Sequence, residues 1–131
     1  MRMETGLGVV HLFGKPKKSV DRDAVTAAVK AAEADDCQVI TAALLGHKAD
    51  VAFMALAPDW QTLRQFQTAL QLAGLEIVDS YVSITEVSEY AKGMPEDMLR
   101  ARMYPQLPPE GLNAFCFYPM SKRRDPEYNW Y

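Results

Sequence analysis

The sequence has few of the features that would assign it to a class at once. No apolar run approaches the roughly 18 residues of a transmembrane helix, so we expect no membrane span. Basic residues are not in excess, because 14 lysines and arginines accompany 17 aspartates and glutamates for a net charge of −3. We therefore expect no nucleic-acid partner. The N-terminus lacks the apolar stretch and cleavage site of a signal peptide, which favours a cytoplasmic location.

Cysteine and histidine are also scarce, with two of each in 131 residues. Cys37 and Cys116 lie in apolar, strand-like runs without the spacing of a metal or redox motif, so both are predicted to be buried thiols in a reducing compartment. His11 alternates within an apolar strand, which favours a core or edge position. His47 falls in a predicted turn and is expected to be solvated. We assign no metal ligand in this chain.

The remaining composition is that of one globular domain over residues 1–131, with 49% hydrophobic and 24% charged residues. Apolar residues recur at helical spacing in two segments, of which Asp21 or Ser19 can cap the first and Gly74 can end the second. Four other segments are apolar or alternating and are bounded by glycine, proline or turn residues. The predicted strands are residues 7–13, 37–45, 51–56 and 76–87, and the predicted helices are residues 20–36 and 58–74.

This order, β-α-β-β-α-β, predicts an α+β domain of the ferredoxin-like type, with two helices packed on one face of an antiparallel sheet. From residue 91 the pattern changes, because residues 91–111 contain four prolines and no sustained period. We expect residues 89–113 to form a long loop with one helical turn, facing a substrate. An additional strand should follow at residues 114–119, within a terminal segment 114–131 that docks on another part of the protein.

The terminal segment FCFYPMSKRRDPEYNWY carries the most distinctive side chains. In an extended chain Tyr118, Met120 and Lys122 share one face. Arg102 and Tyr104 are a second pair two residues apart, and the following proline favours an extended Tyr104. Phenols and cations that converge in this way suit a flat ligand with carboxylate arms. The alternative is that the basic run is a solvated surface and that the tyrosine and methionine serve packing.

Four runs, GHKADVAFMAL, SYVSITEVSEY, RARMYPQLPP and FYPMSKRRDPEYNWY, resemble in order and spacing the N-terminal half of the coproheme decarboxylases. These enzymes belong to the chlorite dismutase superfamily, and the resemblance covers nearly the whole chain. It implies a longer protein of two ferredoxin-like halves, forming homo-oligomers (pentamers), with the iron-ligating histidine in the C-terminal half. The terminal segment would then dock on that half, in the same chain or a second polypeptide. The sequence does not distinguish between a shortened chain, a fragment and one subunit of a two-chain enzyme. In each case we expect no activity without the C-terminal half.

The resemblance also implies a reaction. Coproheme would be both substrate and redox cofactor, and hydrogen peroxide would drive the removal of two propionate carboxylates to give haem b. Tyr118 would be the redox tyrosine whose phenoxyl radical takes hydrogen from a propionate, and Lys122 would balance charge and protons beside it. Arg102 and Tyr104 would bind propionates, and Met120 would pack at the porphyrin edge.

Two alternatives accompany this interpretation. The first is a chlorite dismutase-type haem enzyme, although that chemistry needs no tyrosine at a propionate. The second is a non-catalytic structural or haem-binding module of the same superfamily.

Overall fold

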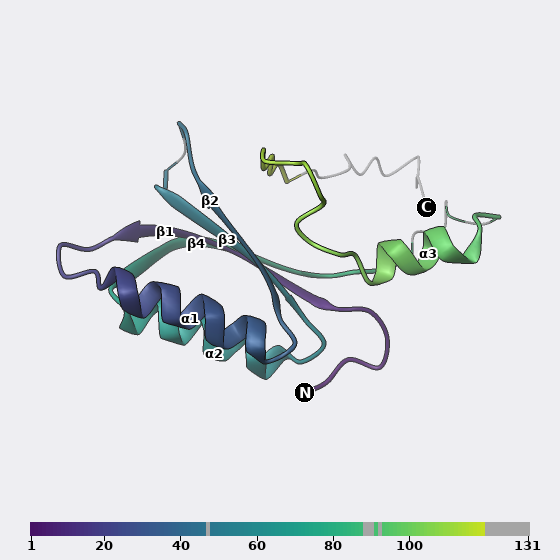
Figure 1. Cartoon of the computed structure of the whole chain (residues 1–131), viewed down its shortest axis with the longest axis horizontal. Helices are drawn as coiled ribbons and strands as arrows, with labels where there is room; N and C mark the ends of the chain where they lie inside the picture. The colour runs from purple at the N-terminus through teal and green to yellow at the C-terminus, as the bar shows by residue number, and fades with distance from the viewer. Residues whose placement is uncertain (47, 88–90, 92, 120–131) are drawn as a thin grey trace, which may run out of the picture.

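The structure, a computed structural model, describes residues 1–46, 48–87, 91 and 93–119. The predicted order of the first six elements is confirmed, and Figure 1 shows their arrangement. The elements are β1 Gly8–Pro16, α1 Arg22–Ala34, β2 Gln38–Ala43, β3 Val51–Ala57, α2 Trp60–Leu72, β4 Leu75–Ile84 and α3 Glu96–Met103.

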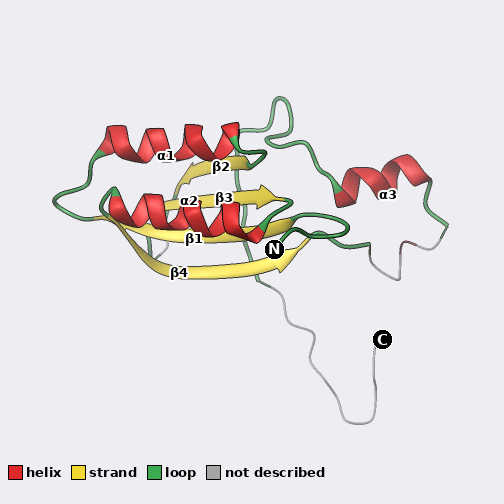
Figure 2. Cartoon of the chain, turned by 90° about the horizontal axis from the view of Figure 1, so that it is seen from below, coloured by secondary structure: helices red, strands yellow, loops and turns green. Residues whose placement is uncertain are grey.

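The four strands form one antiparallel sheet in the order β2-β3-β1-β4. Helices α1 and α2 lie side by side on one face of it (Figure 2). This is the predicted ferredoxin-like arrangement. The main core lies between these helices and the sheet, where Leu12, Phe53, Phe66 and Leu70 are buried. Burial of large apolar side chains at this interface is the chief source of stability for the fold.

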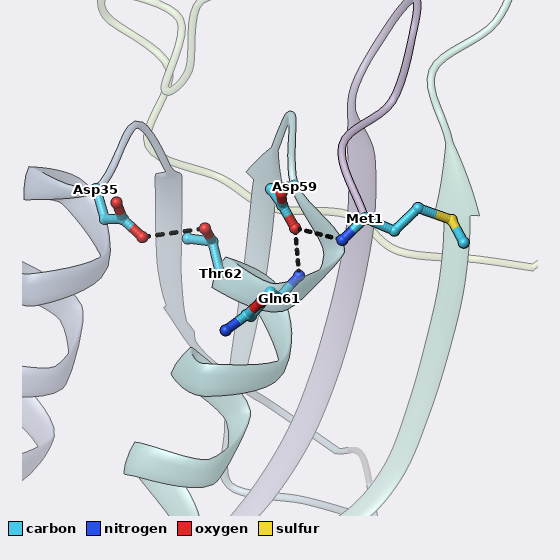
Figure 3. A network of polar contacts seen from close by, with 5 residues as sticks. All are labelled: Met1, Asp35, Asp59, Gln61 and Thr62. Carbon is cyan, nitrogen blue, oxygen red and sulfur yellow. Dashed lines mark hydrogen bonds and ion pairs between the residues drawn. The ribbon is translucent and has the colours of Figure 1, made fainter.

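Polar residues fix the ends of the two helices. Asp21 accepts hydrogen bonds from two backbone amides at the start of α1, as predicted for a cap. Asp59 caps α2 by accepting from the amide of Gln61 at 2.8 Å, and it also pairs with the Met1 ammonium at 3.1 Å (Figure 3). The amide hydrogen bond, followed by the one from the ammonium, lowers the pKa of Asp59. Thr62 donates to Asp35, which links α2 to the end of α1.

The face of the sheet away from α1 and α2, here called the open face, is covered in part by the chain that follows α3. His11, Met54 and Tyr81 lie opposite one another in the strand register and therefore share this face. Leu107 packs on it beside Val9 and Leu56, and Phe115 and Phe117 pack beside Phe13 and Ala52, as the contact clusters show. We call residues 105–119 the return segment.

Three sequence predictions need correction. Residues 114–119 form no strand, because their alternating rings are used to pack on the open face rather than to extend a ladder. Cys116 is exposed rather than buried, since its neighbours Phe115 and Phe117 take the inward positions. The expected helical turn within residues 89–113 is an eight-residue helix, α3. Among the described residues, no helix is long and apolar enough to cross a membrane.

Candidate functional site

Tyr118 lies just beyond the point where the return segment is anchored. The centre of the Phe117 ring lies 4.6 Å from the centre of the His11 ring and 5.1 Å from the ring centres of Phe13 and Tyr81. These contacts hold the backbone beside Tyr118 against the sheet, while 70% of the Tyr118 surface remains exposed. A phenol is thus presented outward from a fixed position. Met120 and Lys122, the other predicted members of its face, lie outside the described residues.

Tyr104 lies directly after α3 and is held by a contact from the far end of the chain. Its hydroxyl oxygen accepts a hydrogen bond from the backbone amide of Gly6 at 3.0 Å. The phenol is 42% exposed. A tyrosine hydroxyl can both accept and donate, so its hydrogen remains available for an acceptor such as a carboxylate.

Arg102 lies in the last turn of α3, and its side chain is exposed. Among the residues that the structure describes, it forms no ion pair, so its guanidinium is free for an anionic ligand. The extended-chain argument that placed it beside Tyr104 does not hold, because Arg102 is helical. Arg100 is the cation next to Tyr104: its guanidinium carbon lies 6.0 Å from the centre of the ring. Residues four apart on a helix share a face, which explains this pairing.

The structure does not bring all the predicted residues together. Within the described part of the chain, no hydrogen bond joins Tyr118 to Arg102 or Tyr104, and none of the three lines the cavity beside β2. That cavity has a volume of about 770 Å³ and lies between β2 and the return segment, with Ile40, Met54 and Phe115 among its lining residues. Its lining residues include no charged side chain, so it offers no cation to a carboxylate.

No group of three or more histidine, cysteine, aspartate or glutamate side chains in the described ranges could hold a metal ion. His11 is half-buried beneath Phe115 and Phe117, and its buried Nδ1 has no hydrogen-bond partner there. Burial lowers the pKa of His11, so the neutral ring is favoured. His11 therefore lies at a half-buried position within the sheet, in keeping with the core or edge position predicted for it.

Sequence reasoning missed three residues that shape this region. Gly6 and Thr85 contact the end of α3 from distant parts of the chain, and no short-range pattern predicts such contacts. Arg100 could have been found, because its spacing of four from Tyr104 is the helical one.

Comparisons with known proteins identify relatives of this chain. The profile of the family described as chlorite dismutase matches residues 18–131. A coproheme decarboxylase of Staphylococcus carnosus is 40% identical over 100 residues, covering 67% of this chain and 39% of that protein. A protein of Haloarcula marismortui named as a candidate haem-binding protein is 38% identical over 116 residues, covering 76% of this chain and 17% of that protein.

Solved structures show the same fold. A haem-binding protein from Thermus thermophilus superposes with a TM-score of 0.61 at 21% identity, covering 82% of this chain and 54% of that one. The chain spans less than half the length of the two sequence relatives described above, at 39% and 17%.

Proposed function

The chain belongs to the chlorite dismutase family, and we propose from this premise that it is the N-terminal part of a peroxide-dependent coproheme decarboxylase. The observation that carries the proposal is the 40% identity, over 100 residues, to a protein named coproheme decarboxylase. An exposed phenol on an anchored segment, and an exposed arginine that forms no ion pair with any described residue, support the proposal, since carboxylates bind such groups.

The proposed reaction removes two propionate carboxylates from coproheme III and leaves two vinyl groups, giving haem b. Each propionate releases carbon dioxide, one proton and two electrons. One molecule of hydrogen peroxide accepts these two electrons and, with two protons, becomes two molecules of water. The iron porphyrin supplies the oxidising chemistry when it is bound, and the protein supplies orientation and proton transfer.

Tyr118 is the residue proposed to act on the propionate. Its phenol carries an O–H group that can lose an electron and a proton together. The resulting radical takes a hydrogen atom from the propionate and regenerates the phenol. Arg102 and Tyr104 hold carboxylates, Lys122 balances charge beside the reacting arm, and Met120 packs at the porphyrin edge. The roles of Lys122 and Met120 rest on the sequence resemblance.

The iron ligand, in this proposal, comes from a C-terminal half in the same chain or in a second polypeptide. The short coverage of the relatives supports this division. We propose a cytoplasmic homo-oligomer, pentameric by family resemblance, in which the described chain alone does not turn over substrate.

One experiment separates this function from the alternatives. The complete native protein is loaded with coproheme and titrated with peroxide, and the product is identified by absorbance and mass spectrometry. Haem b formation supports a decarboxylase. Oxygen release from chlorite without haem b would indicate a chlorite dismutase-type enzyme. Tetrapyrrole binding with neither reaction would indicate a haem-binding module, as the names of two relatives suggest.

A further inference from the structure

Three segments that are distant in the sequence meet at the side chain of Thr85. Its hydroxyl oxygen accepts a hydrogen bond from the amide of Leu7 at 2.8 Å and lies 2.8 Å from the carbonyl of Met103, to which it donates. The backbone amide of Thr85 also donates to the carbonyl of Leu7 at 2.9 Å. One threonine therefore connects the end of β4, the turn that leads into β1, and the last residue of α3.

Gly6 completes this junction by allowing a close approach. Its φ is +73°, and a Cβ atom built there would lie 2.7 Å from the backbone oxygen of Thr85. Only glycine fits this conformation and this space. The approach brings the amide of Gly6 to the hydroxyl of Tyr104, so Thr85 and Gly6 together determine where that phenol lies.

The junction also changes the electrostatics at the end of α3. The last carbonyls of a helix have no partner within it and carry partial negative charge, which repels an anion. The hydroxyl of Thr85 donates to the carbonyl of Met103. The backbone amide of Tyr104 donates to the carbonyl of Arg100 at 2.8 Å. These bonds satisfy two of the terminal carbonyl acceptors of α3. Arg100 and Arg102 in the last turn add positive charge beside them.

We propose that Thr85 is a positioning residue: it holds the Tyr104 phenol for donation to a substrate carboxylate and satisfies a helix carbonyl that would otherwise repel that carboxylate. The inference rests on the proposed function for the identity of the ligand, a porphyrin with four carboxylates. The geometry at Thr85, Gly6 and Tyr104 holds without any ligand.

The test uses the complete native protein, four single variants and one double variant. Thr85→Val keeps the side-chain shape but can neither accept nor donate, whereas Thr85→Ser keeps both capacities. Tyr104→Phe removes the phenol hydroxyl. Thr62→Val is the matched control, because it makes the same substitution in a threonine whose hydroxyl bonds to Asp35, at the helical face.

Coproheme affinity is measured first, by titration without peroxide. Thr85→Val should weaken binding by roughly two- to tenfold, the range expected from one hydrogen bond, and Thr85→Ser should bind as the parent does. In a Tyr104→Phe background, Thr85→Val should cause little further loss, since the residue acts through the phenol. Equal affinity of Thr85→Val and the parent, or full additivity with Tyr104→Phe, would overturn the proposal. So would an equal loss in Thr62→Val.

A second readout needs no ligand. In amide hydrogen exchange, Gly6 should lose protection in Thr85→Val and keep it in Thr85→Ser, because the valine variant no longer holds the turn against α3. Failure of the parent protein to bind coproheme would contradict the proposed function, and the exchange data would then decide the positioning role alone. Unchanged protection of Gly6 in Thr85→Val would contradict that role.

Discussion

At the scale of the residue, Gly6 and Gly46 allow the cost of backbone strain to be distinguished from the cost of steric crowding. Gly6 and Gly46 have nearly the same φ, +73° and +71°, but a Cβ at Gly46 would meet nothing within 4 Å. We predict that Gly46→Ala costs about 1–2 kcal/mol of unfolding free energy, the ordinary cost of the left-handed conformation. Gly6→Ala should cost about 2–5 kcal/mol, because overpacking against Thr85 adds to the same strain.

Chemical denaturation of both variants measures this difference. Equal losses of unfolding free energy would mean that the turn at Gly6 relaxes away from Thr85, and that the junction at the end of α3 is looser than described.

His11 gives the stability a pH dependence. Burial lowers its pKa below 6.5 in the folded protein, whereas the unfolded side chain titrates near 6.5. The unfolded state therefore binds more protons as the pH falls, so the contribution of His11 is complete above about pH 6.5 and is lost as the pH drops below that value. We predict that the free energy of unfolding decreases between about pH 7 and pH 5, and that it decreases less in His11→Phe. Parallel pH profiles of the two proteins would contradict this assignment.

Some residues of the candidate site can be predicted from local sequence, and others cannot. Arg102 with Tyr104, and Tyr118 with Met120 and Lys122, are predicted from side-chain type and a spacing of two residues, and their roles stay predictions. The partners of these residues cannot be predicted in this way, because the bond between Gly6 and Tyr104 spans 98 positions and that between Leu7 and Thr85 spans 78. Contacts at such separations depend on how the whole sheet assembles.

At the scale of the element, Gln38 connects the return segment to β2. Its side-chain amide donates to the carbonyl of Pro105 at 2.8 Å, and its oxygen accepts from the amide of Leu107 at 2.7 Å. We predict that Gln38→Leu lowers the unfolding free energy by about 1–3 kcal/mol, because it leaves the Leu107 amide without its acceptor. Hydrogen exchange at Leu107 should accelerate at the same time.

Gln38→Glu is the matched control for this prediction. It keeps an acceptor for Leu107 but replaces the donor to Pro105 with an oxygen that the Pro105 carbonyl repels, so Leu107 should remain protected while the contact with Pro105 is lost. If Gln38→Leu leaves Leu107 as protected as in the parent, the return segment is held by its apolar contacts alone.

The helices and strands can be predicted from the sequence where apolar residues recur with a clear period. The first six elements follow from alternation, helical spacing and their glycine and proline boundaries. Helix α3 was underestimated because it buries no residue and so has no apolar stripe, although Glu96 and Asp97 in its first turn and Arg100 and Arg102 in its last are typical of helix ends. Residues 114–119 alternate as a strand does but form none. Phe115 and Phe117 pack on the open face, and the segment pairs with no strand of the described chain.

At the scale of the whole molecule, the two faces of the sheet have different roles. Helices α1 and α2 cover one face, whereas α3 and the return segment lie away from them (Figures 1 and 2). The described residues proposed to contact substrate, Arg102, Tyr104 and Tyr118, all belong to α3 or to the chain that follows it. Because these three residues lie outside the main core, we predict that replacing them reduces turnover more than it reduces the free energy of unfolding.

Tyr118 is the residue on which the proposed oxidative decarboxylation depends. The direct measurement is the yield of haem b when the complete native protein, loaded with coproheme, is titrated with hydrogen peroxide. Tyr118→Phe keeps the ring and removes the oxygen. Tyr81→Phe is the matched control, since its ring also contacts Phe117 but it has no assigned role in the reaction.

Both variants should bind coproheme within a few-fold of the parent protein. We predict that Tyr81→Phe forms haem b at the parent rate and that Tyr118→Phe is slower by about a hundredfold or more, a barrier increase of roughly 2.7 kcal/mol. Haem b formation by Tyr118→Phe at the parent rate would contradict the account, because the phenol would then serve no purpose in the reaction.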